Sequence, residues 1–401
     1  MTDSQKLLSR KYLIYKLFTN LWFVSAVWLY FYRIFITDQQ VGILDGIAFA
    51  IGLIAEVPSG ALADKFGRDK LVKIGHILAG CGLLLQAFST SLPFFIIGQA
   101  TMMIGVSFVS GADEALFYEN LKFNENSKQW RKLVTRGSQV GLIATLFATI
   151  AGGWLHNIDP KIPWVLNGLT FIIAVIMIWN IKDKRERKSR GSVVSEVKDY
   201  LLDIKTGFAQ FKLPKLRLYV PFIITVQGLF YTTGYGLLRL VLLDRFGFSI
   251  FLGSIALASS TIITVALLSY LHKYSDKFSE KRVLTSIGLA AAASLLLSLA
   301  DIGLWGYIVI LVIYAGEHVL QPIISEILNK KAPEDQRATT LSVASFFKTL
   351  PYVILAPIIG TLNNEGKLEY FLLTWAIFIF LAVGLYIIVK RKDTKINISE
   401  E

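Results

Sequence analysis

Residues 60–70 read GALADKFGRDK and lie between two apolar stretches that are each long enough to cross a membrane. These eleven residues hold two glycines, two acids and three bases. Gly67 permits a backbone conformation that other residues rarely adopt, and Arg68 can form a forked pair with a carboxylate. A plain basic loop would fix topology by its charge alone. We favour a functional role, because part of this stretch recurs later in the chain.

Composition places the chain in a membrane. Of its 401 residues, 54% are hydrophobic and only 17% are charged, and the apolar residues come in runs of twenty or more. The net charge of +12 comes mainly from loops, so membrane orientation explains it better than nucleic-acid binding does. Cys81 is the only cysteine, which excludes disulfides and cysteine-based metal sites. The polar residues 1–11 precede a long aromatic segment, so we expect no cleavable signal.

Hydropathy and length predict an all-α polytopic membrane protein with twelve spans. Only helices satisfy their own backbone groups in lipid, and no alternating ten-residue pattern points to a barrel. The expected spans are residues 12–36, 40–62, 70–89, 92–118, 133–156, 163–181, 216–243, 249–271, 282–300, 303–329, 338–362 and 368–389.

Basic residues set the expected orientation. The loops on one side of the predicted membrane hold only Lys161, Arg245 and Lys367, whereas most of the other 38 Lys and Arg residues fall on the opposite side. We therefore expect both termini to be cytoplasmic. The longest inner segment opens with a charge run at 182–188 and continues as an amphipathic pattern typical of a helix at the membrane surface.

The two halves of the chain echo each other. Residues 276–278 repeat the Asp-Lys-Phe of residues 64–66 at an offset of 212. Ser279 replaces Gly67 and His272 replaces Gly60, so the second copy is degraded. Six-span repeats are a known transporter plan. The predicted organisation is a first six-helix bundle at 1–181, a central loop with an amphipathic helix at 182–215, and a second bundle at 216–401.

On these features the chain resembles the major facilitator superfamily of secondary transporters. The family signature after span 2 is matched by Gly60, Leu62, Ala63, Asp64, Gly67, Arg68 and Lys70. The resemblance implies that Asp64 and Arg68 form a charge network with an acid at the inner end of span 4, here Glu119, which latches the outward-facing state. It also implies that spans 1, 4, 7 and 10 surround a central cavity.

Two departures separate the chain from the proton-coupled drug antiporters of that superfamily. Those proteins carry an Arg in span 4, whereas residues 101–105 here read TMMIG. Their span 5 carries a Gly-Pro signature, of which residues 148–153 keep only the final glycine pair. The stretches 56–60, 110–116 and 337–339 nevertheless resemble a bacterial branch of drug-resistance transporters.

Ionisable residues inside spans are costly and indicate function. Glu317 and His318 lie near the middle of span 10, where a carboxyl can take up and release a proton; the alternative is a structural ion pair with Lys348. Asp113 and Glu114 lie in the inner half of span 4, where they either couple a cation or pair with Arg136.

Two acids of span 2 have open roles. Glu56 precedes Pro58 and is either a buried acid at a hinge or a structural acid bonded to span 4 or 11. Asp45 faces span 11 or the cavity. Lys16 and Arg239 lie near span ends and are expected to extend to the interface.

A bulky amphipathic substrate suits the residues at mid-depth of spans 1 and 7 better than a sugar does. The expected cavity-lining residues are Asn20, Trp22, Phe23, Gln227, Phe230 and Tyr231.

The leading hypothesis is a proton-coupled secondary transporter that exports small amphipathic compounds by rocker-switch alternating access. One alternative is an uptake porter for a nutrient, peptide or siderophore; another is a lipid flippase or a non-transporting scaffold. The sequence has no phosphate-binding loop, metal cluster or catalytic triad, so we expect no enzyme and no cofactor. The expected setting is a bacterial plasma membrane, with protons, lipid and a small molecule as partners, no nucleic acid, and a monomeric state.

Overall fold

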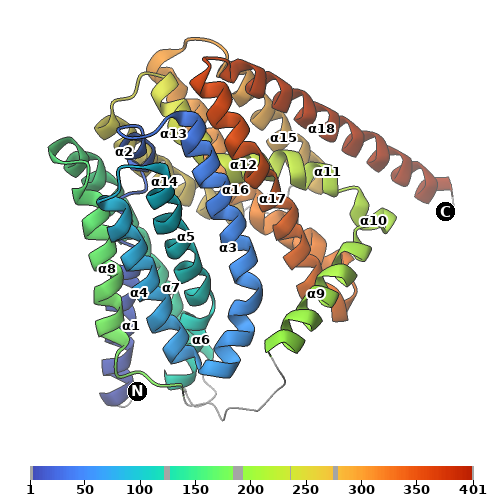
Figure 1. Cartoon of the computed structure of the whole chain (residues 1–401). Helices are drawn as coiled ribbons and strands as arrows, with labels where there is room; N and C mark the ends of the chain where they lie inside the picture. The colour runs from blue at the N-terminus through green and yellow to red at the C-terminus, as the bar shows by residue number, and fades with distance from the viewer. Residues whose placement is uncertain (1–2, 122–126, 184–192, 235, 274–278, 400–401) are drawn as a thin grey trace. The chain divides into compact units, whose positions relative to one another are not determined.

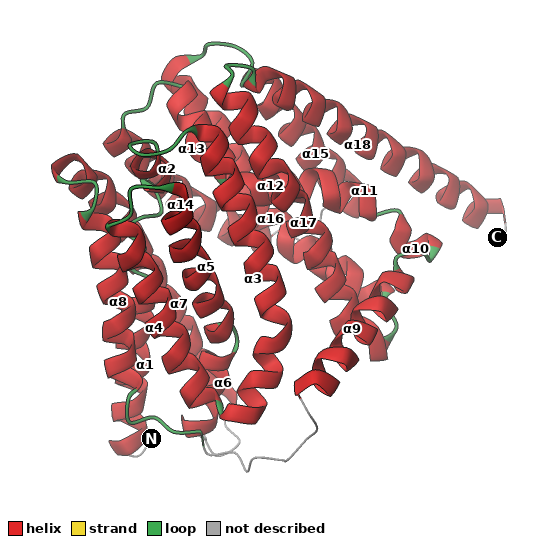
Figure 2. Ribbon diagram, in the orientation of Figure 1, coloured by secondary structure: helices red, strands yellow, loops and turns green. Residues whose placement is uncertain are grey.

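The computed structural model describes residues 3–121, 127–183, 193–234, 236–273 and 279–399. Within these ranges every regular element is a helix, as Figure 2 shows. Eight of the described helices are long and apolar enough to cross a membrane, and shorter apolar helices accompany them. The predicted all-α fold is confirmed.

The helices overlap the predicted spans, although several spans contain more than one helix. The first group is α1 (Asp3–Thr19), α2 (Trp28–Tyr32), α3 (Asp38–Phe66), α4 (Arg68–Ala87), α5 (Leu92–Val109), α6 (Ala112–Leu121), α7 (Ser127–Ile158) and α8 (Ile162–Ile178). A central helix, α9 (Val193–Gln210), lies where the amphipathic pattern predicts one (Figure 1). The preceding charge run is described only at residues 182–183, and the repeat at 276–278 lies wholly outside the described residues.

The second group contains shorter pieces as well as long helices. It comprises α10 (Pro214–Arg217), α11 (Val220–Phe222), α12 (Gly228–Gly234), α13 (Leu237–Arg245), α14 (Ile250–Lys273), α15 (Glu280–Leu297), α16 (Tyr307–Lys331), α17 (Arg337–Asn364) and α18 (Leu368–Ser399). A π-helical stretch at Ile223–Gln227 joins α11 to α12.

Span 1 is not one continuous helix as predicted, because α1 stops at Thr19 and α2 starts at Trp28. Side chains of neighbouring helices bind the irregular backbone between them. Thr145 of α7 donates to the Asn20 carbonyl at 3.0 Å, and Asn167 of α8 accepts from the Val24 N–H at 3.3 Å. Irregular backbone at membrane depth persists where protein groups satisfy it, and the sequence pattern of span 1 does not show those distant partners.

Spans 4 and 7 are broken too. Gly111 adopts a φ of 72°, a conformation that favours glycine, and separates α5 from α6. Span 7 contains the π-helical stretch and a second interruption at Gly236, whose backbone is extended directly before α13. Spans 1, 4 and 7 are three of the four that the resemblance places around the cavity, and π-helical segments are frequent at functional sites.

Packing divides the chain into two units. Unit 1 comprises Met1–Ile36, Ile47–Tyr200 and Ile250–Ile255, and unit 2 comprises Thr37–Gly46, Leu201–Ser249 and Ala256–Glu401. In unit 1, α4 packs along α5 and α8. Its glycines allow the close approach, because a Cβ at Gly75 would lie 2.7 Å from the Gly105 carbonyl oxygen.

In unit 2, α15 packs along α18, and α12 packs against α16 and α17. The first turns of α3 also belong to this unit and lie directly on α17. There, a Cβ at Gly42 would overlap the Ala356 carbonyl oxygen, and a Cβ at Gly360 would overlap the Asp38 carbonyl oxygen. The two backbones are therefore too close for side chains at these glycines.

Candidate functional site

A charged cluster lies inside unit 1, where α1 meets the start of α6. The Lys16 ammonium lies 3.0 Å from Asp113 Oδ2 and 3.2 Å from Glu114 Oε1. The Lys16 and Asp113 side chains are only 15% and 13% exposed, whereas that of Glu114 is half exposed. The break at Gly111 puts both acids in the first turn of α6, where the helix dipole favours negative charge.

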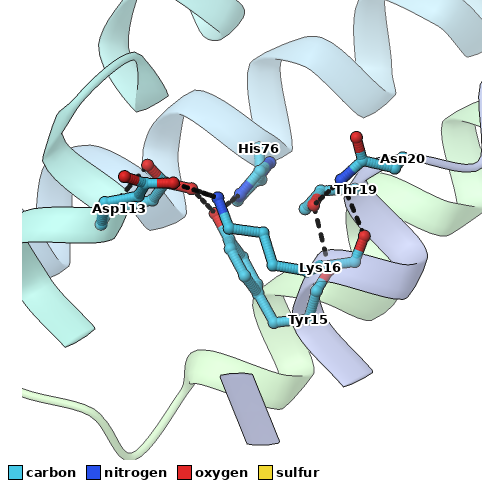
Figure 3. A network of polar contacts seen from close by, with 7 residues as sticks. Tyr15, Lys16, Thr19, Asn20, His76 and Asp113 are labelled. Carbon is cyan, nitrogen blue, oxygen red and sulfur yellow. Dashed lines mark hydrogen bonds and ion pairs between the residues drawn. The ribbon is translucent and has the colours of Figure 1, made fainter. Parts of the chain in front are cut away.

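Two further side chains complete this cluster. Figure 3 shows Tyr15 and Lys16 pointing from α1 toward Asp113, with His76 of α4 next to the Tyr15 hydroxyl. That hydroxyl lies 3.2 Å from Asp113 Oδ2, to which it donates, and 2.8 Å from His76 Nε2. Asn20 donates to the Lys16 carbonyl at 2.8 Å, which closes the C-terminal turn of α1 above the cluster.

The unit 1 cluster corrects two sequence-based expectations. Lys16 does not extend to the interface but is largely buried beside two acids. Asp113 and Glu114 both pair with Lys16 rather than with Arg136, which is exposed on α7. The two acids share one partner, although the side chains of adjacent residues on a helix point about 100° apart. His76 was missed, and its position within an apolar span was the available signal.

Unit 2 contains a second polar cluster, between α16 and α17. The Lys348 ammonium lies 3.6 Å from Glu317 Oε1 and donates to Gln321 Oε1 at 3.1 Å. Gln227, from the π-helical stretch, donates to the same Gln321 oxygen at 2.6 Å. Tyr231 of α12 presents its ring to Lys348, with 5.3 Å between the ammonium and the ring centroid.

Glu317 is the least satisfied member of the unit 2 cluster. The residue is only 4% exposed. Its Oε2 atom has no hydrogen-bond partner among the residues that the structure describes. His318, the neighbouring candidate in span 10, packs its ring edge-on against Tyr314 with 4.8 Å between centroids. Arg239, which was expected to extend to the interface, instead donates from its Nη1 to the Gly234 carbonyl at 2.9 Å.

Asp45 faces α17, one of its two expected orientations. It is 5% exposed and accepts a short hydrogen bond from the Tyr352 hydroxyl. The same hydroxyl accepts from the Leu237 N–H at 2.7 Å, at the start of α13. Tyr352 therefore binds the backbone at the interruption of span 7, and a Cβ at Gly236 would overlap its ring.

The signature loop forms a contact within unit 1. Gly67 has a φ of 93° and precedes α4, whose first residue is Arg68. Arg68 Nη1 lies 2.7 Å from Glu119 Oε1, and the Arg68 N–H donates to Asp183 Oδ2 at 3.0 Å. Asp64 is exposed near the end of α3.

The other residues of span 2 and the loop are less constrained. Glu56 is exposed, so one of its two expected roles, that of a buried acid at a hinge, is wrong. Lys70 is exposed, and a Cβ at Gly60 would meet no atom within 4 Å.

The aromatic residues expected to line a cavity pack within their own units. Trp22 packs edge-on against Phe171, and Phe23 is buried. Phe230 is 1% exposed and its ring occupies the space beside Gly316. Gln227 and Tyr231 belong instead to the Glu317 cluster.

A separate open cavity of about 530 Å³ follows the C-terminal half of α16. It is lined by Pro322, Ser325, Glu326, Asn329, Lys330 and Arg337. Among the described residues, no group of three or more His, Cys, Asp or Glu side chains is placed to hold a metal ion.

Long apolar helices with breaks beside buried ion pairs define a polytopic membrane transporter. The chain belongs to the Major Facilitator Superfamily, whose family model matches residues 13–356. It is therefore a membrane transporter for a small molecule rather than an enzyme.

Two relatives from Bacillus subtilis (strain 168) align over most of the chain. The uncharacterized MFS-type transporter YxaM is 21% identical over 378 residues, which cover 90% of each chain. Multidrug resistance protein 2 is 22% identical over 355 residues, which cover 86% of this chain and 85% of the relative. The crystal structure of the nucleoside transporter NupG superposes with a TM-score of 0.72 at 13% identity, covering 96% of this chain and 98% of the other. At this identity the last likeness concerns the fold alone.

Proposed function

We propose that the protein is a proton-coupled secondary transporter that exports small amphipathic compounds by rocker-switch alternating access. The observation that carries the proposal is the Glu317 carboxyl, which is buried with one oxygen beside Lys348 and the other without a hydrogen-bond partner among the described residues. A buried charge with incomplete partners is costly. The similarity to a multidrug resistance protein supports efflux and a broad substrate class.

Protonation of Glu317 changes both the charge of its carboxyl and the contact between two helices. The neutral carboxyl no longer attracts Lys348, so the same event weakens the contact between α16 and α17. Lys348 keeps its bond to Gln321, and through Gln321 it remains connected to Gln227 and the π-helical stretch. A proton at Glu317 can thus alter the packing of three helical segments.

The unit 1 cluster is the second part of the proposed machinery. Two acids face one ammonium there, so the cluster has a surplus negative charge. Such a surplus favours the cationic group of a substrate. Because Asp113 and Glu114 lie two and three residues after Gly111, a change in their charge acts close to the point where the helix is already interrupted.

The remaining parts of the proposal follow from sequence and family. We place the protein in the inner membrane of a bacterium, as a monomer with both termini in the cytoplasm, because basic residues concentrate in the loops on one side. The six-helix bundles are assigned to residues 1–181 and 216–401. The Arg68–Glu119 contact, together with Asp64, is proposed as the latch of the outward-facing state.

Inside-out membrane vesicles that contain the protein test the coupling. Ethidium, a planar amphipathic cation, serves as the fluorescent probe. We expect its accumulation to require an imposed pH gradient, and Glu317→Gln to abolish that requirement together with most of the flux. Glu365→Gln removes an exposed acid in a Glu365–Lys367 pair and is the matched control. Flux that is independent of the gradient in both wild type and Glu317→Gln would refute the coupling.

Intact cells that contain the protein decide the direction of transport. Accumulation of a nutrient, peptide or siderophore by intact cells against its gradient, without export from them, would establish an uptake porter. Wild-type function after neutralisation of Asp113, Glu114 and Glu317 together would instead indicate a scaffold.

A further inference from the structure

The Lys16 ammonium in unit 1 is surrounded by carboxylates and aromatic rings. Asp113 Oδ2 and Glu114 Oε1 lie 3.0 Å and 3.2 Å from it. The rings of Tyr12 and Tyr15 face the same ammonium, with 5.6 Å and 5.9 Å between it and the ring centroids. These four residues form an ammonium cage, because aromatic faces attract organic ammonium ions and carboxylates neutralise their charge. A side chain of the protein itself occupies this cage.

Neighbouring side chains hold the walls of the ammonium cage in place. Phe117 of α6 packs against both rings, with 5.0 Å between its centroid and that of Tyr12 and 5.2 Å to that of Tyr15. Both tyrosines are fully buried. The Tyr15 hydroxyl donates to Asp113 at 3.2 Å and lies 2.8 Å from His76 Nε2, as Figure 3 shows. Because these walls are already ordered, a cation that binds there loses little free energy to ordering them.

Two helix ends add to the attraction for a cation. Lys16 lies in the last turn of α1, and the C-terminal end of a helix interacts favourably with positive charge. Asp113 and Glu114 lie in the first turn of α6, where the opposite end of the helix dipole favours carboxylates. These preferences belong to the helix ends and not to the lysine side chain. They therefore act equally on a free ammonium ion in the same place.

Lys16 does not satisfy the ammonium cage completely. Two carboxylates face its single ammonium, so one negative charge is left over. The Tyr12 hydroxyl is buried and has no hydrogen-bond partner among the residues that the structure describes, which costs free energy. The Glu114 side chain is half exposed, whereas those of Lys16 and Asp113 are largely buried. A ligand therefore reaches the cage from the side of Glu114, where it meets the surplus charge.

We propose that the ammonium cage binds an organic ammonium group of the transported compound and that Lys16 is its tethered competitor. The incoming ion displaces the Lys16 ammonium from the two carboxylates, and the flexible stem of the lysine lets its charge move toward water. One cation replaces another, so neither acid is left buried without a counter-charge. The inference rests on the proposed export function for calling the ligand a substrate. Its test measures binding without a pH gradient or flux, so the two proposals can fail independently.

Chemical rescue tests the ammonium cage. Lys16→Ala removes the tethered ammonium, and n-propylammonium replaces the atoms that are lost beyond Cβ. We expect the variant to melt below wild type, and n-propylammonium chloride at saturation to restore roughly half or more of the lost melting temperature. The isosteric but uncharged n-propanol should restore little. Lys367→Ala, which removes an exposed ammonium from a pair with Glu365, is the matched control and should not respond to either compound.

Ethidium fluorescence in detergent solution tests the competition by Lys16. Lys16→Ala should bind ethidium about 3- to 30-fold more tightly than wild type, because binding no longer requires displacement of the lysine. Asp113→Asn should bind it more weakly than wild type does. If Lys16→Ala does not fold, Lys16→Gln takes its place, because glutamine keeps most of the volume and loses the charge.

Two results would overturn the proposal. One is equal affinity for ethidium in wild type and in the folded Lys16 variant, which would mean that Lys16 competes with no ligand. The other is folded Lys16→Ala protein that n-propylammonium stabilises no more than n-propanol does, which would mean that the cage has no preference for an ammonium ion.

Discussion

The hydroxyl of Tyr352 donates to the buried carboxyl of Asp45 and binds α17 to the first turns of α3. The two residues are 307 positions apart in the chain. Because the same hydroxyl accepts from the Leu237 N–H, one oxygen atom serves an acid and an interrupted helix together. Loss of this oxygen would leave two buried polar groups unsatisfied.

Tyr352→Phe should therefore destabilise the protein by about 1–3 kcal/mol, the usual cost of leaving buried polar groups without partners. Chemical unfolding in detergent measures the change. Tyr118→Phe is the control, because its side chain is 56% exposed and only its hydroxyl is removed. Combining Tyr352→Phe with Asp45→Asn should restore part of the lost stability, since burying an amide costs less free energy than burying a charge. Wild-type stability of Tyr352→Phe would contradict this.

Lys16 and Asp113 should behave as one unit in a double-mutant cycle. Lys16→Gln leaves Asp113 and Glu114 together without a cation, and Asp113→Asn leaves Lys16 with the half-exposed Glu114. The two single changes together should lower the free energy of unfolding by more than the double change does, with a coupling energy of about 0.5–3 kcal/mol. Thermal unfolding of the four proteins measures it. Additive effects would mean that the pair contributes little, and Glu114→Gln should couple more weakly because its side chain is 50% exposed.

Gly42→Ala should force α3 away from α17, because the added Cβ would overlap the Ala356 carbonyl oxygen. We expect the free energy of unfolding to fall by about 1–3 kcal/mol, as it does when a side chain is added to a tightly packed interior. Gly384→Ala is the matched control on α18, where a Cβ meets no atom within 4 Å. That change should be neutral or stabilising, since alanine is more stable than glycine inside a helix by about 0.5–1 kcal/mol. Equal melting temperatures for the two variants would show that α3 and α17 do not pack this closely.

Glu280 should make stability depend on pH in the acidic range. Burial alone would raise the pKa of this carboxyl, but hydrogen bonds from Tyr219 and Tyr386 and the charge of Lys390 leave the pKa below its ordinary value. Because the folded-state pKa lies below the unfolded one, the stabilisation is fully present above the ordinary pKa of about 4.3. It is lost as the pH falls through the folded-state pKa.

Melting temperatures measured from about pH 7 to about pH 3.5 check this. Glu280→Gln should be less stable than wild type at the neutral end, and the difference should shrink toward the acidic end. Glu365→Gln controls for the loss of an acid in general. A difference that stayed constant with pH would mean that the carboxylate charge is not what Tyr219, Tyr386 and Lys390 stabilise.

Part of the candidate site could be read from the chain. The pairing of Glu317 with Lys348 was one of two expected outcomes, because only a few ionisable residues lie in the apolar spans. The approach of Arg68 to Glu119 followed from the family signature. Lys16 was not connected to Asp113, because 97 residues separate them and the break at Gly111 changes the direction of the acids. His76 and Tyr352 were missed because their roles depend on which helix each one faces.

By itself the sequence determined the class of fold, through apolar runs of membrane length and a charged signature loop. The length of an apolar run and the charge of a loop are local properties, and they alone decide which segments are stable in lipid and which in water. Only the tertiary structure decided where the spans are interrupted and which charges meet. The break after Asn20 persists because Thr145 and Asn167 satisfy its backbone, and the Asp45 carboxyl is buried where Tyr352 can reach it. Such partners come from distant parts of the chain, and hydrogen bonds and ion pairs depend on separations of a few ångströms that only the packed helices define.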